Sequence, residues 1–186
     1  MTIEKQKLNY LYCLAMMMLS FSSFANISYV SVGATNAEID VDSESFDLSA
    51  FNFGYTNVTD KYIFSAGIQR GEIEVYGYDL DYVTNGISFG YGFSDISQGS
   101  FVLGLEHASI EIQDPGSSNL KDSSTDPFIG YYKISGEDLD YSISISDSVL
   151  SGNVSFPLGE GQWRGALGFS NSSDASGVSF GVRVLL

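Results

Sequence analysis

Apolar and polar residues alternate at every second position over most of the chain beyond residue 26. The segment 176–186 shows the pattern most clearly, because its even positions are mostly Val, Phe and Leu and its odd positions mostly Ser, Gly and Arg. Side chains of a strand point alternately to its two faces, so this period predicts strands with one apolar and one polar face. Ten segments have the pattern: 27–36, 46–56, 61–75, 80–93, 100–112, 127–135, 140–148, 150–158, 162–171 and 176–186.

The two faces of these strands differ in a way that favours a membrane barrel. The apolar face carries large and often aromatic residues, and the polar face is mostly Ser and Gly. A soluble barrel would place bulky residues inside and Lys and Glu outside. Small polar residues suit a narrow lumen, and aromatic residues suit lipid.

The predicted fold is therefore an all-β, transmembrane, antiparallel up-and-down barrel. Beyond residue 26 no run of 18 or more apolar residues is present, which excludes spanning by helices. Strands cross lipid only as a closed barrel without edges. Ten strands is an even number, as in bacterial barrels, but the short segments 140–148 and 150–158 leave eight strands as the alternative.

The alternation of apolar residues changes parity near 50–51, 70–71 and 107–108. Either β-bulges or strand ends that rise above the lipid would produce this change.

The first 25 residues have the pattern of a secretory signal peptide. Lys5 and Lys7 precede the apolar stretch 11–19, and Ser23-Phe24-Ala25 follows it as a small-x-small cleavage site. A transmembrane anchor is the alternative, but the stretch is shorter than the ~20 residues that span a bilayer. We expect cleavage after Ala25, a barrel over 26–186, and export to the bacterial outer membrane.

Composition excludes several classes of function. Eight Lys and Arg against 23 Asp and Glu give a net charge of −15, which is unsuited to nucleic acid. The single Cys, Cys13, lies in the predicted signal peptide, so no disulfide framework is expected. His107 is the only His, and no nucleophile elbow, metal-ligand spacing or phosphate loop accompanies it. We expect no enzyme activity, no cofactor, and no catalytic or metal-binding residue.

Four charged residues are predicted to face the lumen: Glu106, Lys133, Arg164 and Arg183. Gln69 is expected beside them, and Glu72 is a further candidate. An unpaired charge in a narrow barrel is costly, so we expect Glu106 to pair with Arg164 or Arg183 and so to plug the lumen. The alternative is that each charge is separately solvated in a wet interior.

With both termini on the periplasmic side, the longer and more acidic connectors fall outside the cell, around 37–45, 76–81 and 113–126. Asp40, Asp42 and Glu44 form the densest acidic group. Such carboxylates can bind Ca²⁺ or Mg²⁺ shared with lipopolysaccharide phosphates, but the Gly and spacing of an EF-hand loop are missing. We therefore expect solvated acidic loops.

Aromatic residues recur near the predicted periplasmic ends of the strands, as in the interfacial girdle of membrane barrels. They are Tyr55, Tyr62, Phe64, Phe93, Phe101, Phe156 and Trp163.

The end of the chain resembles the C-terminal β-signal of bacterial outer-membrane proteins. Ser179, Gly181, Val184 and Leu186 occupy the positions of the signal, although that family usually ends in Phe or another aromatic residue. The resemblance implies recognition by the barrel-assembly machinery. Together with the signal peptide and the strands, it makes the chain similar to the small barrels typified by the OmpA membrane domain and the OmpX/Ail group.

We expect a monomeric, non-catalytic barrel with a structural or adhesion-like role at the cell surface, exerted through its acidic outer loops. Its expected partners are outer-membrane lipid, lipopolysaccharide and a host or cell-surface ligand. The alternative is a narrow passive pore for small solutes, because ten strands with a Ser- and Gly-lined interior can leave a thread of water.

Overall fold

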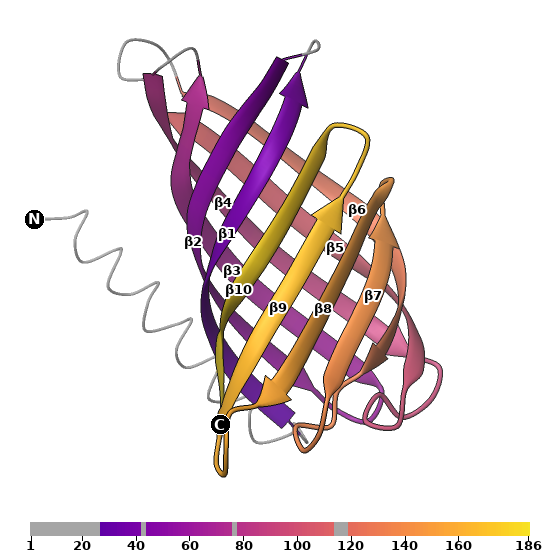
Figure 1. Cartoon of the computed structure of the whole chain (residues 1–186). Helices are drawn as coiled ribbons and strands as arrows, with labels where there is room; N and C mark the ends of the chain where they lie inside the picture. The colour runs from indigo at the N-terminus through magenta and orange to yellow at the C-terminus, as the bar shows by residue number, and fades with distance from the viewer. Residues whose placement is uncertain (1–26, 42–43, 76–77, 114–118) are drawn as a thin grey trace, which may run out of the picture.

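The computed structural model describes residues 27–41, 44–75, 78–113 and 119–186. The predicted signal peptide lies outside these residues and stays a prediction. Ten strands form one closed barrel in which each strand runs antiparallel to its neighbours, with β1 paired to β10 (Figure 1). The strands are β1 (Ile27–Val41), β2 (Glu44–Val58), β3 (Tyr62–Val75), β4 (Tyr78–Gly92), β5 (Ser100–Gln113), β6 (Leu120–Lys133), β7 (Asp140–Ser146), β8 (Val149–Pro157), β9 (Trp163–Asn171) and β10 (Ala175–Leu185).

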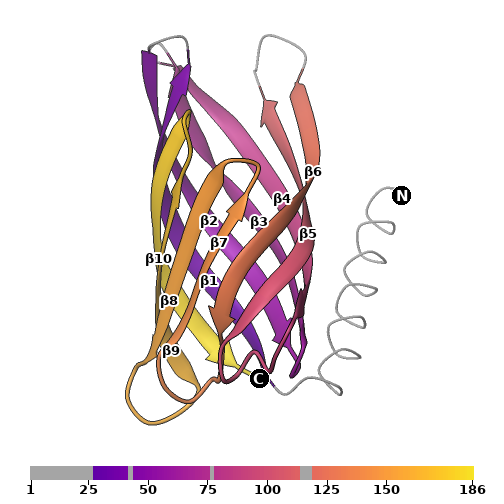
Figure 2. The same ribbon diagram turned by 90° about the vertical axis from the view of Figure 1, so that its right-hand side faces the viewer.

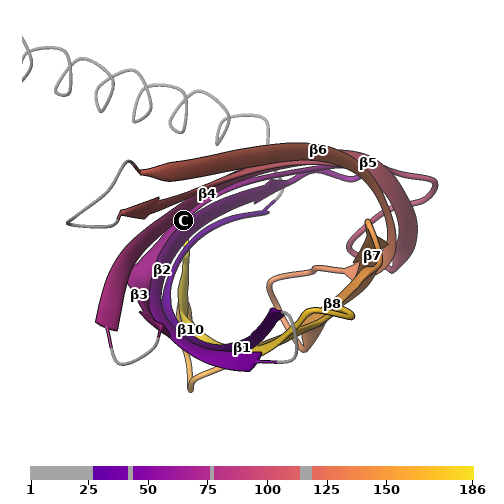
Figure 3. The ribbon, with the colours of Figure 1, turned by 90° about the horizontal axis from the view of Figure 1, so that it is seen from above.

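These strands confirm the predicted all-β, antiparallel up-and-down barrel, and their number is ten. We call the end that holds the start of β1 and the end of β10 the base, and the opposite end the rim. Seen from above, the strands lie in one ring (Figure 3).

The barrel wall is tall on one side and low on the other. Strands β1 to β6 have 14 or 15 residues, and β7 to β10 have 7 to 11. Strand β1 has six residues more than β9, which at about 3.3 Å per residue makes it about 20 Å longer. The upper ends of β1 to β6 consequently project above β7 to β10 (Figure 2). We call these two parts the tall wall and the low wall.

The outward face of the lower and middle barrel is an apolar belt of exposed side chains. Trp163 is 59% exposed and Leu105 is 58% exposed, values that a folded chain in water rarely gives to large apolar residues in such numbers. The belt runs around the whole barrel. It includes Val32, Phe53, Ile68, Ile87, Phe89, Leu103, Ile129, Ile143, Ile145, Leu167, Phe180 and Val182.

Toward the rim of the tall wall the two faces exchange character. Leu48, Ala50, Ile73 and Tyr82 point inward and pack as a buried cluster. The outward positions beside them are charged or hydroxylated and exposed, and they include Asp47, Ser49, Glu72, Glu74, Asp79 and Asp81.

This exchange explains the parity changes of the sequence. The ladders pass through all three places with every residue paired in turn, as from Phe51↔Arg70 to Ala50↔Gly71. No bulge therefore occurs there; the apolar residues change from the outward to the inward face of unbroken ladders, as the alternative of strand ends that rise above the lipid requires.

The connectors differ from the predicted sorting. Asp40 lies in β1 and Glu44 in β2, so most of 37–45 is strand, and Asp42 lies outside the described residues. Residues 78–81 and 120–126 are also strand. The longer described connectors, 93–99 and 134–139, lie at the base. The acidic segments are at the predicted end, but they extend the strands because their acids alternate with apolar residues that point inward.

Strand β7 turns into β8 through Asp147 and Ser148, whose φ angles are 39° and 66°. Two-residue hairpin turns with two positive φ angles prefer Asn-Gly. The double substitution Asp147→Asn and Ser148→Gly should raise the free energy of unfolding by about 1 kcal/mol, measured by urea titration of the refolded barrel. Ser176→Gly, in extended β10, is the control and should lower it. A gain of equal size in both variants would contradict the turn assignment.

Candidate functional site

The base of the barrel is filled by an apolar cluster inside the lumen. Ile96 comes from the β4–β5 connector and Ile134 from the β6–β7 connector, and both fold inward. Ile96 and Val102 have no exposed surface. Backbone hydrogen bonds tie the connectors together, from Ile134 N to Ile96 O at 3.1 Å and from Ile96 N to Asp60 O at 2.8 Å. The remaining members of the cluster are Tyr29, Val58, Ile63 and Phe128, with Ile27, Tyr132 and Leu185 packed against them.

We call the apolar cluster, together with Arg164 of the low wall, the base plug. The Arg164 side chain points inward from β9, is 1% exposed, and lies 3.2 Å from the carboxylate of Asp140. Its Nε donates to Ser155 Oγ at 2.9 Å, and its Nη atoms donate to backbone oxygens of Gly136, Asp138 and Ser155. The guanidinium therefore fastens the β6–β7 connector to the neighbouring strands β8 and β9.

Asp140 is itself held by the same connector. It is 2% exposed and accepts from the backbone N–H groups of Ser135 at 2.8 Å and Gly136 at 3.0 Å. A buried ion pair is stable when both ions have further hydrogen bonds, and this condition is met here. With the apolar cluster, the pair leaves the base of the lumen filled by side chains.

The predicted lumen charges are distributed differently from the expectation. Arg164 and Arg183 point inward, but neither pairs with Glu106, because Arg164 binds Asp140 instead. Glu106 is inward on β5 and lies directly opposite Asp126 of β6. Lys133 is on the outer face, opposite the exposed Tyr141, so its inward placement was wrong. The reason is that Phe128 and Tyr132 face the lumen, which puts position 133 outside.

Arg183 lies in the lower lumen with few partners. Its guanidinium stands over the ring of Tyr29, 4.8 Å from the centroid, and one Nη donates to Asn153 Oδ1 at 2.5 Å. The Nε atom is buried and has no hydrogen-bond partner.

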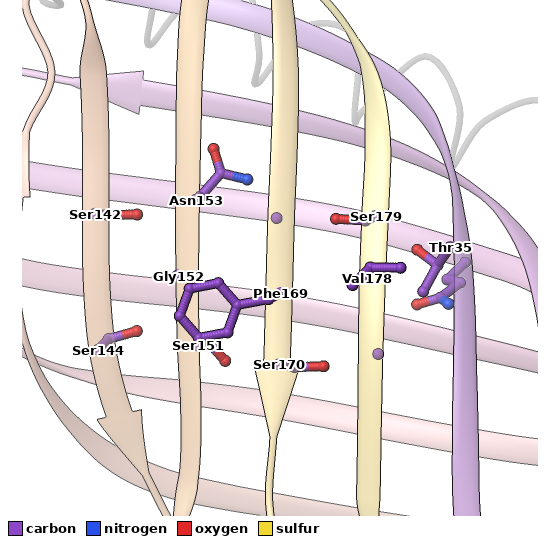
Figure 4. A pocket seen from close by; sticks show the side chains of 13 residues that line it. Thr35, Ser142, Ser144, Ser151, Gly152, Asn153, Phe169, Ser170, Val178 and Ser179 are labelled. Carbon is purple, nitrogen blue, oxygen red and sulfur yellow. The ribbon is translucent and has the colours of Figure 1, made fainter.

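Above the base plug, the low wall encloses a polar cavity of about 300 Å³, which we call the cup. Its inward side chains are hydroxyl and amide groups from β7 to β10, joined by Thr35 of β1 (Figure 4). Gln69 of β3 also lines the cup. The groups from the low wall are Ser142, Ser144, Ser151, Asn153, Ser170 and Ser179. Because the base is filled, the cup has its access from the rim.

Acidic residues cover the outer face of the tall wall and lie opposite one another across strands. Glu72 faces Asp81 and Glu74 faces Asp79 between β3 and β4. Glu38 faces Asp47 between β1 and β2. Like charges directly opposite are destabilising, so folding alone does not favour this arrangement.

One pair near the rim is complementary. Lys121 Nζ lies 2.9 Å from Glu111, and Asn119 donates to the same carboxylate at 2.7 Å. Hydrogen bonding to Lys121 and Asn119 lowers the pKa of Glu111 below its usual value. At Asp40, the hydroxyl of Ser45 donates to the carboxylate.

His107 faces outward near the upper limit of the apolar belt, and its Nδ1 is 2.8 Å from Thr125 Oγ1. Among the described residues, no three His, Cys, Asp or Glu side chains gather to hold a metal ion. We also find, in that part of the chain, no helix with the length and apolarity of a membrane span.

Aromatic rings in contact line the outer face toward the base. Tyr62 lies 5.4 Å from Tyr91 between ring centroids, and Phe101 lies 5.4 Å from Tyr131. Phe93 and Trp163 are exposed at the same end. This arrangement has the form of an interfacial girdle.

The residues of the predicted assembly signal lie on the closing strand. Ser179 and Gly181 face the lumen, where a Cβ at Gly181 would meet Val32 O at 2.4 Å. Val184 is opposite Val30, and the Leu186 amide donates to Ser28 O at 2.9 Å. Their recognition by an assembly machinery stays a prediction.

Comparison with known proteins gave structural similarities only. No family model matches the chain, and no curated protein matches it. Neisserial surface protein A is similar over 84% of this chain and 96% of its own, with 17% identity and a TM-score of 0.44. Ail, the attachment invasion locus protein of Yersinia pestis, is similar over 87% of this chain and 99% of its own, with 12% identity and a TM-score of 0.40. The outer membrane protein OprG of Pseudomonas aeruginosa is similar over 87% of this chain and 96% of its own, with 11% identity and a TM-score of 0.44. Ail belongs to the group of small barrels that the sequence resembles.

Sequence reasoning missed Asp140, Ile96 and Ile134. A signal for Asp140 was present, because it shares the even parity of Ser142 and Ser144 in β7. A single apolar residue within the polar stretch 94–98 was the corresponding signal for Ile96.

Loss of the central guanidinium should weaken the whole base. Arg164→Met leaves the buried carboxylate of Asp140 without its counter-ion, and should lower the free energy of unfolding by about 3–5 kcal/mol in urea titration. Adding Asp140→Asn should restore part of the loss. Arg70→Met, at an exposed outward position, is the control and should change it by less than about 0.5 kcal/mol. Equal effects of Arg164→Met and Arg70→Met would contradict the structural role of the pair.

Proposed function

We propose that this chain is an outer-membrane β-barrel of a Gram-negative bacterium, exported by a signal peptide that is cleaved after Ala25. The apolar belt supports this proposal, because exposed Phe, Leu, Ile and Val around a closed barrel suit the hydrocarbon of a bilayer. In this orientation the base, where β1 begins and β10 ends, faces the periplasm. The rim faces the outside. Outer-membrane lipid and lipopolysaccharide surround the barrel, and the barrel-assembly machinery inserts it.

The barrel acts at its outer surface as a monomeric, non-catalytic interaction protein. The observation that carries this proposal is the filled base, where Ile96, Val102 and Arg164 have almost no exposed surface. A passive pore needs a continuous water path, and these side chains occupy its periplasmic end. The part of the molecule left for function is the rim.

The acidic outer face of the tall wall gives the rim its chemistry. Three pairs of carboxylates face each other across strands, and the two members of each pair repel one another. They lie on the part of the tall wall that projects above the low wall. A positively charged partner relieves this repulsion, and complementary charge mainly promotes encounter and specificity. We therefore favour a basic surface of a host protein or of another cell as the partner.

A passive pore for small solutes is the rival function, and it requires the base plug to leave the lumen. The refolded protein, residues 26–186, should show no discrete openings in a planar bilayer. A variant with Ile96→Gly, Ile134→Gly and Arg164→Ala should conduct, because these changes remove the plug from both connectors and the low wall.

Ile143→Gly, Ile145→Gly and Arg70→Ala form the matched control, which changes outward side chains, and it should stay silent. Steady openings of the unaltered barrel would favour the pore and contradict the proposed function.

Measurements of binding and of stability together test the role of the acidic outer face of the tall wall. With the barrel in nanodiscs, Glu72→Gln and Asp81→Asn should weaken binding of a fluorescent oligolysine peptide, and should raise the urea midpoint because a repulsive pair is lost. Glu137→Gln and Glu160→Gln remove the same charge at the base and should leave peptide binding nearly unchanged. Equal loss of binding in both variants would show that net charge, rather than the tall wall, binds the peptide.

A further inference from the structure

The two inward arginines of this barrel have opposite environments. Arg164 has a carboxylate, a hydroxyl and backbone oxygens around its guanidinium. Arg183, beside it across the β9–β10 ladder, has one side-chain acceptor, Asn153. Within the described residues, no carboxylate oxygen lies within 4.0 Å of Arg183. The charge of Arg183 is therefore not neutralised by an ion pair in the barrel.

The guanidinium of Arg183 is held in place, but its hydrogen-bond donors are not all satisfied. The Tyr29 ring lies under the guanidinium, and stacking of this kind orients the cation. Arg has five N–H donors, and its Nε is buried without an acceptor. Buried donors without partners are rare in folded proteins, so an acceptor beside this guanidinium would be stabilised.

The space beside Arg183 leads to the cup. A small cavity of about 70 Å³ is lined by Arg183, Asn52, Asn153 and Ser179. Asn153 and Ser179 also line the cup of about 300 Å³, so the two cavities adjoin. The lining of the cup contains hydroxyl and amide side chains but no charged one, and Arg183 is the one charged residue among the described residues that line the small cavity.

We propose that the cup binds a small hydroxyl-rich molecule with one oxyanion, such as an acidic sugar, and that Arg183 holds the oxyanion. A carboxylate or phosphate accepts two hydrogen bonds from a guanidinium in a planar geometry. The Ser and Asn side chains bind the hydroxyl groups of the same ligand. A volume of about 300 Å³ matches the smaller binding pockets of proteins. The inference rests on the proposed function only for the side of access, which places the ligand in the external medium.

Calorimetric titration of the refolded barrel, residues 26–186, in detergent tests the proposal with sodium glucuronate as the probe. Glucuronate should bind saturably, and glucose, which has the same ring without the carboxylate, should bind at least about tenfold more weakly. Arg183→Met should weaken glucuronate binding at least about tenfold, whereas Arg70→Met, which removes an outward charge, should leave it unchanged.

A second variant keeps Arg183 and closes the cup. Ser170 is inward and exposed near the rim, so Ser170→Trp should fit and obstruct the entrance. It should abolish glucuronate binding while the circular dichroism spectrum keeps its β-sheet form. Absence of binding to the unaltered barrel, or full binding to Arg183→Met or Ser170→Trp, would overturn the proposal. Equal binding of inorganic phosphate and glucuronate would overturn the role of the hydroxyl-lined cup. Channel openings would count against the proposed function but not against this site.

Discussion

Closure of the sheet is the constraint on which the rest of this structure depends. Lipid offers no hydrogen-bond partners, so strands cross a bilayer only when each one is paired on both sides. Pairing of β1 with β10 meets this requirement, and the ladders continue from Tyr29↔Leu185 to Ile39↔Ala175. Once the ring is closed, alternation gives every strand one face toward the lumen and one toward the surroundings. The apolar belt and the cup follow from which side chains occupy those two faces, and the base plug adds side chains of connectors that fold into the lumen.

The same ladders pass from the apolar belt to the acidic upper part of the tall wall without a change in backbone pairing. In β2, Phe51 and Phe53 are outward in the belt, whereas Leu48 and Ala50 turn inward nearer the rim. The upper limit of the belt is therefore set by side chains alone. Above it, the inward cluster of Leu48, Ala50, Ile73 and Tyr82 gives the tall wall a small apolar core of its own. The outward carboxylates of the tall wall are thereby presented well above the low wall.

The sequence predicts the strands well because a period of two extends over long segments and needs no tertiary information. The inward positions of Arg164 and Arg183 follow from the same parity. Lys133 was misplaced because the large residues 131 and 132 precede it, and neither is a small residue that marks the lumen. The acidic segments lie at the predicted end of the barrel, but many of their residues are strand and not loop, because the faces exchange near the rim. The base plug could not be predicted, since it depends on connectors that fold into the lumen, and no local pattern specifies the partner of Arg164.

The central claim is that the belt lies in lipid and ends at the exchange of faces. Spin labels at outward positions of β2, introduced by Phe53→Cys, Phe51→Cys, Ser49→Cys and Asp47→Cys, test it in bilayers by comparing relaxation by oxygen and by a water-soluble nickel complex. We expect positions 53 and 51 to be relaxed mainly by oxygen, which concentrates in lipid, and positions 49 and 47 mainly by nickel. Strong relaxation by nickel at all four positions would contradict the account, because the belt would then lie in water.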